Sequence, residues 1–230
     1  MANVLLGVTG SVAAILTPNL YDELKRAGHR VKVVATQAAL YFFDAALLDP
    51  VDPQRPQRNS EVVILDEDEW PGRGQGRQYQ RTDRVLHIEL RRWADLLLVA
   101  PLDANTLAKL ATGLADNCLT CVWRAWDRNR PIVLAPAMNT LMWEHPLTGR
   151  HLRQLAMDAG TASPSANLDL MDLVGWINAQ CRGLQIVAPR SKRLACDDVG
   201  VGAMASLEDL VAAVQALTQT TSASLRPEAT

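Results

Sequence analysis

The apolar run from Pro131 to Ala135 constrains the fold more than any other stretch of the chain. A short run without polar side chains, with a proline at its start and another directly after it, is typical of a strand buried on both faces of a parallel sheet. The run from Leu96 to Ala100 has the same character. Parallel strands need long crossover connections, so we expect helices between these runs that cover both faces of the sheet.

Further apolar runs extend this pattern along the chain. Residues 3–8 form the first run, a helical segment follows up to Gly28, and residues 31–35 form the next run, which together indicate a βαβ unit. We predict strands at residues 3–8, 31–35, 62–65, 96–100, 131–135 and 185–187, and helices near 37–42, 88–94, 106–112, 116–126, 146–159 and 207–217. The pattern predicts one α/β domain with a doubly wound, mostly parallel sheet.

Three other segments carry weaker signals. Residues 49–60 are rich in proline and charge, and residues 71–82 are rich in Gly, Gln and Arg, so both are expected to be loops. The pattern does not fix the path of residues 161–190. Residues 218–230 lack an apolar stripe and are expected to form a disordered tail, which leaves residues 1–217 as the folded domain.

Composition narrows the class of partner. A formal net charge of -2 and a pI near 6.1 provide no basic surface for nucleic acid or an anionic membrane, so we expect a small-molecule substrate. No apolar stretch approaches the ~20 residues of a membrane-spanning helix and no leader-like segment precedes the first strand, which predicts a cytoplasmic protein. The 4 cysteines are too few for a disulfide scaffold in a chain of 230 residues.

Small and polar residues follow the first two predicted strands. Gly10 and Ser11 lie between a strand and a helix, where backbone amides attract a phosphate, although in isolation a tight turn with a helix cap is the favoured explanation. The segment Thr36 to Ala38 would lie beside the same crevice and complete a phosphate cradle. The chain has no G-x-G-x-x-G motif and no acidic residue placed for a dinucleotide ribose. A mononucleotide such as FMN therefore fits better than NAD.

Four motifs occur in order along the rest of the chain. They are HIELRRWAD (87–95), LDANTLAKLA (102–111), PAMNTLMW (136–143) and KRLAC (192–196). Together with the N-terminal LLGVTGSVAA they resemble the homo-oligomeric, flavin-containing cysteine decarboxylases over residues 3–210. The resemblance implies a Rossmann-like (flavodoxin-like) flavoprotein domain with bound FMN. It also implies FMN-dependent decarboxylation of 4'-phospho-N-pantothenoylcysteine to 4'-phosphopantetheine in coenzyme A biosynthesis, by a homotrimer or a multiple of three with the site between subunits.

The resemblance also implies the roles of individual residues. His87 corresponds to the catalytic base and Cys196 to the proton donor, while Asn139 corresponds to the holder of the substrate carboxylate and amide. The remaining implied substrate contacts are Arg193, Ala195 and Met204, from a lid. The implied cofactor contacts are Gly10, Ser11, Val12, Thr36, Gln37, Ala38, Asp103, Ala104, Asn105, Thr106 and Ala137. No metal site is expected. The family usually has glycine directly after the cysteine, where this chain has Asp197.

Several of these residues have structural alternatives. Asp103 to Thr106 can cap a helix, and a lone histidine such as His87 is more often a surface residue. Cys118 and Cys121 form a CxxC without a second pair to complete a metal site, so we expect them to pack in the core. The helix bearing Trp123 and Trp126 offers an apolar face for neighbouring elements or for subunit contact. We expect the other histidines, His29, His145 and His151, at the surface.

Other functions remain open at this point. A peptidyl-cysteine decarboxylase needs no proton-donating cysteine, so KRLAC argues against it. A flavin prenyltransferase shares the fold but is not expected to have PAMNTLMW or the histidine of HIELRRWAD. A non-enzymatic, phosphatase-regulating relative usually lacks catalytic residues and carries long acidic extensions, whereas this chain has His87, Asn139 and Cys196 together. An N-acylated cysteine cannot form a Schiff base, which favours a flavin as the electron sink.

Overall fold

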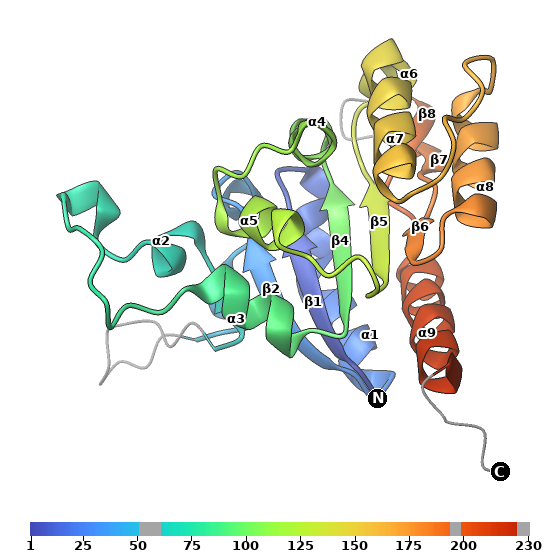
Figure 1. Ribbon diagram of the computed structural model, residues 1–230. Coiled ribbons are helices and arrows are strands. Elements are labelled where there is room, and N and C mark those ends of the chain that lie inside the picture. The colour runs from blue at the N-terminus through green and yellow to red at the C-terminus, as the bar shows by residue number, and fades with distance from the viewer. Residues whose placement is uncertain (51–60, 194–198, 225–230) are drawn as a thin grey trace, which may run out of the picture.

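A six-stranded parallel sheet forms the centre of the computed structural model, which describes residues 1–50, 61–193 and 199–224. The strand order is β3-β2-β1-β4-β5-β6, and each neighbouring pair is parallel. The strands are β1 (Asn3–Val8), β2 (Arg30–Ala35), β3 (Val63–Ile64), β4 (Leu96–Leu102), β5 (Ile132–Pro136) and β6 (Leu184–Ile186). The predicted doubly wound α/β fold is confirmed (Figure 1).

Helices cover both faces of this sheet. They are α1 (Thr17–Arg26), α2 (Asp66–Glu69), α3 (Leu86–Trp93), α4 (Ala104–Thr112), α5 (Cys118–Arg124), α6 (Thr140–Glu144), α7 (Pro146–Asp158), α8 (Leu170–Gln180) and α9 (Leu207–Ser224). Short 3-10 turns lie at Val12–Leu16, Ala39–Tyr41, Ala45–Leu47 and Arg73–Gln75. Side chains of α1 and α9 pack in one core, and those of α3, α4, α5, α7 and α8 pack in the other.

The two cores are built from alternate residues of the same strands. Leu97 and Val99 of β4 belong to the core under α3 to α5, while Leu96 and Leu98 belong to the core under α1 and α9. Every residue of β4 is buried. Because side chains alternate between the faces of a strand, a strand covered on both faces must be apolar throughout. This requirement explains why the apolar runs predicted the central strands.

The strand order places a crevice between β1 and β4. From β1 the chain winds outward through β2 to β3, and from β4 it winds outward in the other direction through β5 to β6. The connections leaving the carboxyl ends of β1 and β4 therefore turn to opposite faces of the sheet. Open α/β sheets bind ligands at such a switch point.

The structure adds elements that the sequence pattern did not predict. An antiparallel hairpin joins β7 (Arg190–Arg193) and β8 (Val199–Ala203), and α8 lies within the segment whose path was not fixed. The helix predicted near 37–42 is only the 3-10 turn at Ala39–Tyr41. These differences have a common cause, because the hairpin and the 3-10 turn lack the long apolar periodicity on which the predictions rest.

The expected start of the tail at residue 218 is wrong, because α9 continues to Ser224. Thr218 Oγ1 donates a hydrogen bond to the carbonyl of Val214, at 2.9 Å, and Leu217 packs against the core. A polar residue can thus continue a helix that is already anchored by its apolar face. Residues 225–230 lie outside the described part of the chain.

His29, which was expected at the surface, is buried, and Trp126 packs against neighbouring elements, which is one of the two alternatives predicted for it. His29 is only 7% exposed, and burial lowers the pKa of its ring. Trp126 is 7% exposed and donates from Nε1 to the carbonyl of Arg130, at 3.2 Å, while Trp123 packs against the same core. Part of the apolar face of α5 is therefore used within the chain, and its role in subunit contact stays a prediction.

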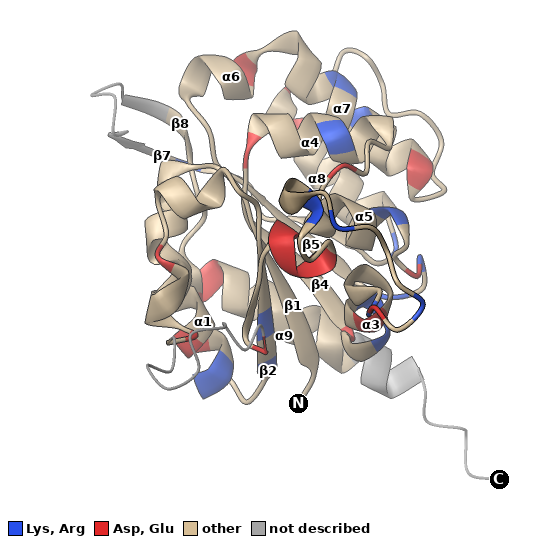
Figure 2. Ribbon diagram, turned by 90° about the vertical axis from the view of Figure 1, so that its left-hand side faces the viewer, with Lys and Arg blue, Asp and Glu red and all other residues tan. Residues whose placement is uncertain are grey.

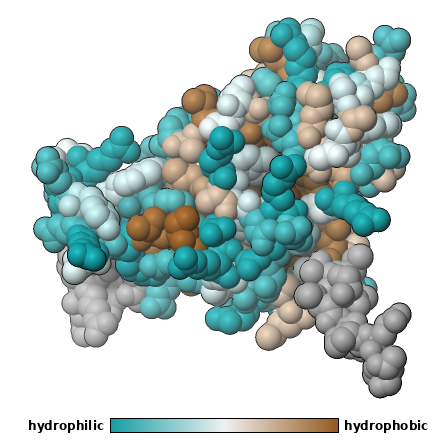
Figure 3. Space-filling view, viewed as in Figure 1, coloured by the Kyte–Doolittle hydropathy of each residue, from teal (hydrophilic) through white to brown (hydrophobic). Residues whose placement is uncertain are grey.

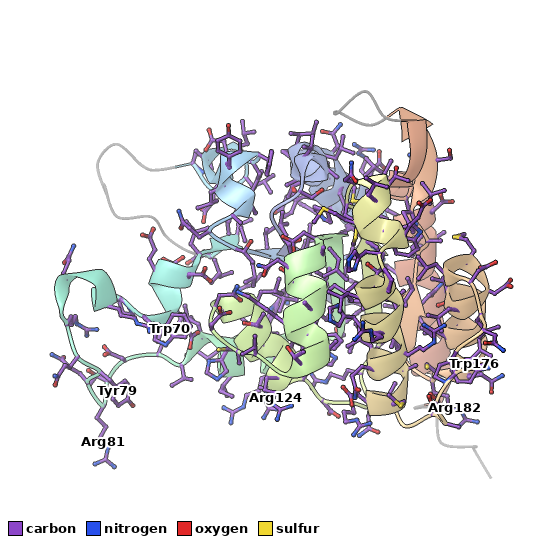
Figure 4. The ribbon with its side chains drawn as sticks, turned by 90° about the horizontal axis from the view of Figure 1, so that it is seen from above. Trp70, Tyr79, Arg81, Arg124, Trp176 and Arg182 are labelled. Carbon is purple, nitrogen blue, oxygen red and sulfur yellow. The ribbon has the colours of Figure 1, made fainter. Side chains whose placement is uncertain are left out.

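The segment between α2 and α3 projects from the body of the molecule (Figure 1). Figure 4 shows Trp70, Tyr79 and Arg81 on this segment, at the far edge of the view from above. Trp70 stacks with the guanidinium of Arg73. Figure 3 shows apolar side chains gathered where the segment meets the body, where Val85 leads into α3 with 39% of its surface exposed. Within the described residues, no helix combines the length and apolarity of a membrane span.

Candidate active site

Thr9 joins the ends of the two strands that flank the crevice. Its side chain is buried at the end of β1, and Oγ1 donates to the carbonyl of Pro101 at 2.8 Å. The same oxygen accepts from the backbone N–H of Asp103, also at 2.8 Å. A single hydroxyl thus satisfies two backbone groups that the end of β4 leaves without sheet partners. The loops after β1 and β4 are held in fixed relative positions as a result.

Gly10 lies where three strand ends converge. A Cβ at this position would be 2.7 Å from Cβ of Ala38, which follows β2, and 3.2 Å from Oδ2 of Asp103, which follows β4. A side chain larger than hydrogen therefore does not fit without a shift of its neighbours. The structure brings together the three predicted cofactor segments at Gly10, Ala38 and Asp103.

Several predicted cofactor residues also have local structural partners. Ser11 Oγ accepts from the N–H of Ala13 at 3.4 Å, so it caps the 3-10 turn that contains Val12. Asp103 Oδ1 accepts from the N–H of Thr106 at 2.7 Å and caps α4. The capping alternative thus holds for Asp103, while Asn105 is exposed beside it.

The predicted cradle contains features that fit a bound mononucleotide. Thr36 Oγ1 is buried at the end of β2 without a hydrogen-bond partner among the described residues. Buried hydroxyls are normally paired, so this oxygen is suited to a ligand. Ala137 is 2% exposed, and its N–H donates to the carbonyl of Leu102 at 2.9 Å. Small residues at Gly10 and Ala137 allow a planar ring to approach the backbone.

Asn139 lies directly beyond the end of β5, as predicted. It is half-buried at the start of α6, and Oδ1 accepts from the N–H of Leu141 at 2.8 Å. The preceding residue, Met138, donates its N–H to the carbonyl of Gly202 in β8 at 2.9 Å. A Cβ on Gly202 would be 2.2 Å from the carbonyl oxygen of Met138. The β7–β8 hairpin therefore packs directly against the end of β5.

The predicted lid residues belong to the segment of the hairpin or directly follow it in the sequence. Arg193 ends β7, and Ala195 and Cys196 lie in residues 194–198, outside the described part of the chain. These residues connect the two strands of the hairpin. Met204 follows β8 and is buried in the core under α1 and α9, with 5% of its surface exposed.

His87 lies at the start of α3, held by a residue that the sequence did not reveal. The backbone N–H of His87 donates to Oε2 of Glu69 at 2.8 Å, and ring Nδ1 is 2.6 Å from Oε1 of the same carboxylate. The Glu69 side chain is almost fully buried and that of His87 is partly exposed. Both views place α3 low on the sheet and α6 above the strand ends (Figures 1 and 2). His87 lies in the first turn of α3, and Asn139 directly precedes α6.

A buried acidic and thiol cluster surrounds this pair. Cys118 Sγ lies 3.8 Å from Oε2 of Glu69, and the N–H of Cys118 donates to Oδ1 of Asp66 at 3.0 Å. Burial and the nearby carboxylates of Glu69 and Asp66 raise the pKa of the Cys118 thiol, and burial raises the pKa of Asp66. A thiol held in its neutral form is a poor nucleophile. Core packing, as predicted for Cys118, is confirmed.

A separate cavity of about 490 Å³ lies at the amino-terminal ends of β5 and β6. Its lining includes Arg124, Arg130, Asp158 and Arg182, and Figure 4 shows Arg124 and Arg182 at the periphery of the molecule. The ends of α4, α5 and α7 also line it, and the carbonyl dipoles at helix ends favour cationic side chains there. Arg130 donates to the carbonyls of Arg91 and Ala94 at the end of α3, so it has a structural role at the end of the sheet opposite the crevice.

Comparisons with known proteins agree with this arrangement. The family model described as Flavoprotein matches residues 1–219. Phosphopantothenoylcysteine decarboxylase of Mus musculus is 45% identical over 215 residues, covering 93% of this chain and 86% of the mouse protein. The enzyme of the same name from Arabidopsis thaliana is 45% identical over 202 residues, covering 88% of this chain and 78% of the plant protein.

Solved structures give the same result. A mutant of PPC decarboxylase complexed with pantothenoylaminoethenethiol superposes with a TM-score of 0.71 at 40% identity, covering 95% of this chain and 98% of that chain. The FMN binding protein AtHal3 superposes with a TM-score of 0.67 at 42% identity, covering 95% of this chain and 97% of that chain. The chain therefore belongs to the flavoprotein family that includes the phosphopantothenoylcysteine decarboxylases.

Proposed function

We propose that this chain catalyses the FMN-dependent decarboxylation of 4'-phospho-N-pantothenoylcysteine to 4'-phosphopantetheine, a step of coenzyme A biosynthesis. The observation that carries the proposal is the convergence of Gly10, Ala38 and Asp103 at the switch point, with Asn139 at the end of β5. The curated relatives named above carry out this decarboxylation by name, and their similarity extends over most of the chain.

The residues that would hold FMN come from four loops. They are Gly10, Ser11 and Val12 after β1, Thr36, Gln37 and Ala38 after β2, Asp103, Ala104, Asn105 and Thr106 after β4, and Ala137 after β5. The buried hydroxyl of Thr36, which has no partner among the described residues, and the absence of a side chain at Gly10 fit such a ligand. When bound, FMN supplies a reversible two-electron acceptor, which an N-acylated cysteine requires because its nitrogen cannot form a Schiff base.

Protein side chains supply the remaining roles of substrate binding, base and proton donor. Asn139 presents an amide that can donate to the substrate carboxylate and accept from its amide N–H, which orients the bond to carbon dioxide. His87 is the base for the substrate thiol, and Cys196 delivers a proton to the carbon that has lost carbon dioxide. Arg193, Ala195 and Met204 are proposed to contact the substrate from the hairpin.

The resemblance to the homo-oligomeric cysteine decarboxylases supports a site shared between subunits. We propose a homotrimer, or a multiple of three, in which His87 of one subunit faces the crevice of the next. Exposed apolar side chains line the rim of that crevice, with Ile15 58% and Leu141 74% exposed. We also propose a cytoplasmic location, which stays a prediction from the sequence.

The proposal is tested by three measurements on purified protein. The parent should show the absorbance of bound flavin and release carbon dioxide from 4'-phospho-N-pantothenoylcysteine. His87→Asn should keep the flavin and lose carbon dioxide release. Cys196→Ser should still release carbon dioxide but accumulate an enethiol that lacks two hydrogen atoms relative to 4'-phosphopantetheine. Protein that takes up no flavin would contradict the proposal, and turnover of Cys196→Ser at the parent rate would reassign the proton donor.

A further inference from the structure

Glu69 makes two contacts with one residue, and that residue is the proposed base. Oε2 accepts from the backbone N–H of His87 at 2.8 Å, and Oε1 lies 2.6 Å from ring Nδ1. The carboxylate is nearly fully buried, whereas 24% of the His87 side chain remains exposed. We propose that Glu69 is a positioning residue, which fixes the orientation and the tautomer of His87 for the reaction. This inference rests on the proposed function for the role of His87, but not for its geometry.

The chemistry of the pair determines where the ring proton lies. An ionised carboxylate only accepts hydrogen bonds, so Nδ1 must carry the proton that is donated to Oε1. Neutral imidazole has one protonated nitrogen, and Nε2 is then left with its lone pair free. The free lone pair is the form that a base needs. With the opposite tautomer, Nε2 would carry a proton and could not accept one from the substrate.

The rest of α2 holds Glu69 in place. Figure 2 shows this all-acidic turn as a red segment beside α5. Asp66 Oδ1 accepts from the N–H of Cys118 at 3.0 Å, and Asp68 Oδ2 accepts from the N–H of Leu65 at 2.7 Å. The thiol of Cys118 lies 3.8 Å from Oε2 of Glu69 and, being held neutral, can donate to it. The turn is therefore anchored to the start of α5, and the Cys118 thiol contacts the Glu69 carboxylate directly.

The same turn also contacts the proposed cofactor loop. The N–H of Gln37 lies 3.4 Å from Oδ2 of Asp66, three residues before Glu69. One short element thus contacts the loop after β2 and the histidine at the start of α3. A base that is held in one rotamer is more often in the orientation that reacts. A rigid support therefore favours its activity.

The orientation is tested first on the unmodified holoprotein. Nitrogen-15 NMR of protein labelled at histidine, recorded at about pH 8.5 where an ordinary imidazole is neutral, distinguishes the two tautomers. The His87 signals are assigned by their loss in His87→Asn. We expect the Nδ1-protonated form. Observation of the Nε2-protonated form in the parent would overturn the inference, whether or not the protein decarboxylates its substrate.

The role is tested with matched variants of α2. Glu69→Gln keeps the size of the side chain but offers one oxygen to two donors, so kcat should fall by about 10²- to 10⁴-fold while FMN content and KM change by less than about twofold. Glu69→Asp keeps the carboxylate and should recover at least about tenfold of the lost kcat and the parent tautomer. The control is Glu67→Gln, an exposed position on the same turn, which should behave as the parent.

The outcomes separate this inference from the proposed function. An unchanged tautomer in Glu69→Gln overturns the positioning role whatever the rate. If Glu69→Gln does not fold, the comparison is made with Glu69→Asp, which should keep the parent tautomer of His87 and a kcat well above that of His87→Asn. Failure of either result would overturn the positioning role. A parent that binds FMN but releases no carbon dioxide refutes the proposed function and leaves the tautomer test valid.

Discussion

At the scale of single residues, the crowding around Gly10 leads to a specific prediction. A Cβ at this position would lie 2.7 Å from Cβ of Ala38, inside the proposed FMN cradle. Gly10→Ala should weaken FMN binding by about tenfold or more, because overpacking costs about 1–3 kcal/mol and each 1.4 kcal/mol is a factor of ten. Fluorescence titration with FMN measures the change. Gly175→Ala is the control, because no atom lies within 4 Å of the added Cβ in α8. Equal affinities for the two variants would contradict the cradle.

His29 provides a second prediction at this scale. Burial lowers the pKa of its ring, so the folded protein binds this proton less readily than the unfolded chain. Above the unfolded pKa of about 6.5 the ring is neutral in both states, and stability is lost as the pH falls below that value. His29→Gln should therefore lose less stability than the parent between about pH 7 and pH 5. Urea unfolding at several pH values measures this difference, and parallel curves would count against the prediction.

At the scale of elements, the contact between β8 and the end of β5 leaves no space for a side chain on Gly202. A Cβ on Gly202 would be 2.2 Å from the carbonyl oxygen of Met138, and a backbone oxygen cannot turn aside as a side chain can. Gly202→Ala should displace the β7–β8 hairpin, which carries the proposed substrate contacts. We expect faster amide hydrogen exchange at Met138 and a higher KM for the substrate, with FMN still bound. Parent-like exchange at Met138 would show that the hairpin packs differently.

The elements that the sequence predicted are those whose physical cause is local. Strands β4 and β5, and β1 after Asn3, are apolar because both faces are covered, and their ends located Gly10, Asp103 and Asn139. The hairpin was missed because β7 is polar and charged and glycines interrupt the apolar residues of β8. Glu69 was missed for a different reason. A run of acidic residues ordinarily indicates a solvated face, and only the tertiary fold brings this one to His87.

At the scale of the whole molecule, the proposed assembly determines whether the site is complete. Light scattering should give three times the chain mass of 25.2 kDa, or a multiple of it. Ile15→Asp introduces a charge at the rim of the crevice and should lower the mass toward that of one chain. Met171→Asp, exposed on α8, is the control. A monomer with full activity would contradict the shared site.

Mixed assemblies test the sharing directly. His87→Asn and Asn139→Asp should each be inactive alone, because each lacks one proposed residue of every site. Co-expressed in one assembly, they should regain activity, since some sites would combine an intact His87 from one chain with an intact Asn139 from another. Absence of any recovery in purified mixed assemblies would place both residues of a site in the same chain.

The projecting segment between α2 and α3 is a closed loop, because Glu69 and His87 join its two ends. The cost of closing a flexible loop grows slowly, by about 0.6 kcal/mol for each doubling of length. The loop can therefore change in length or sequence during evolution while the Glu69 carboxylate keeps its contact with the His87 ring. The same closure makes the loop a natural place to insert a peptide tag or a reporter domain without disturbing the proposed catalytic base, His87.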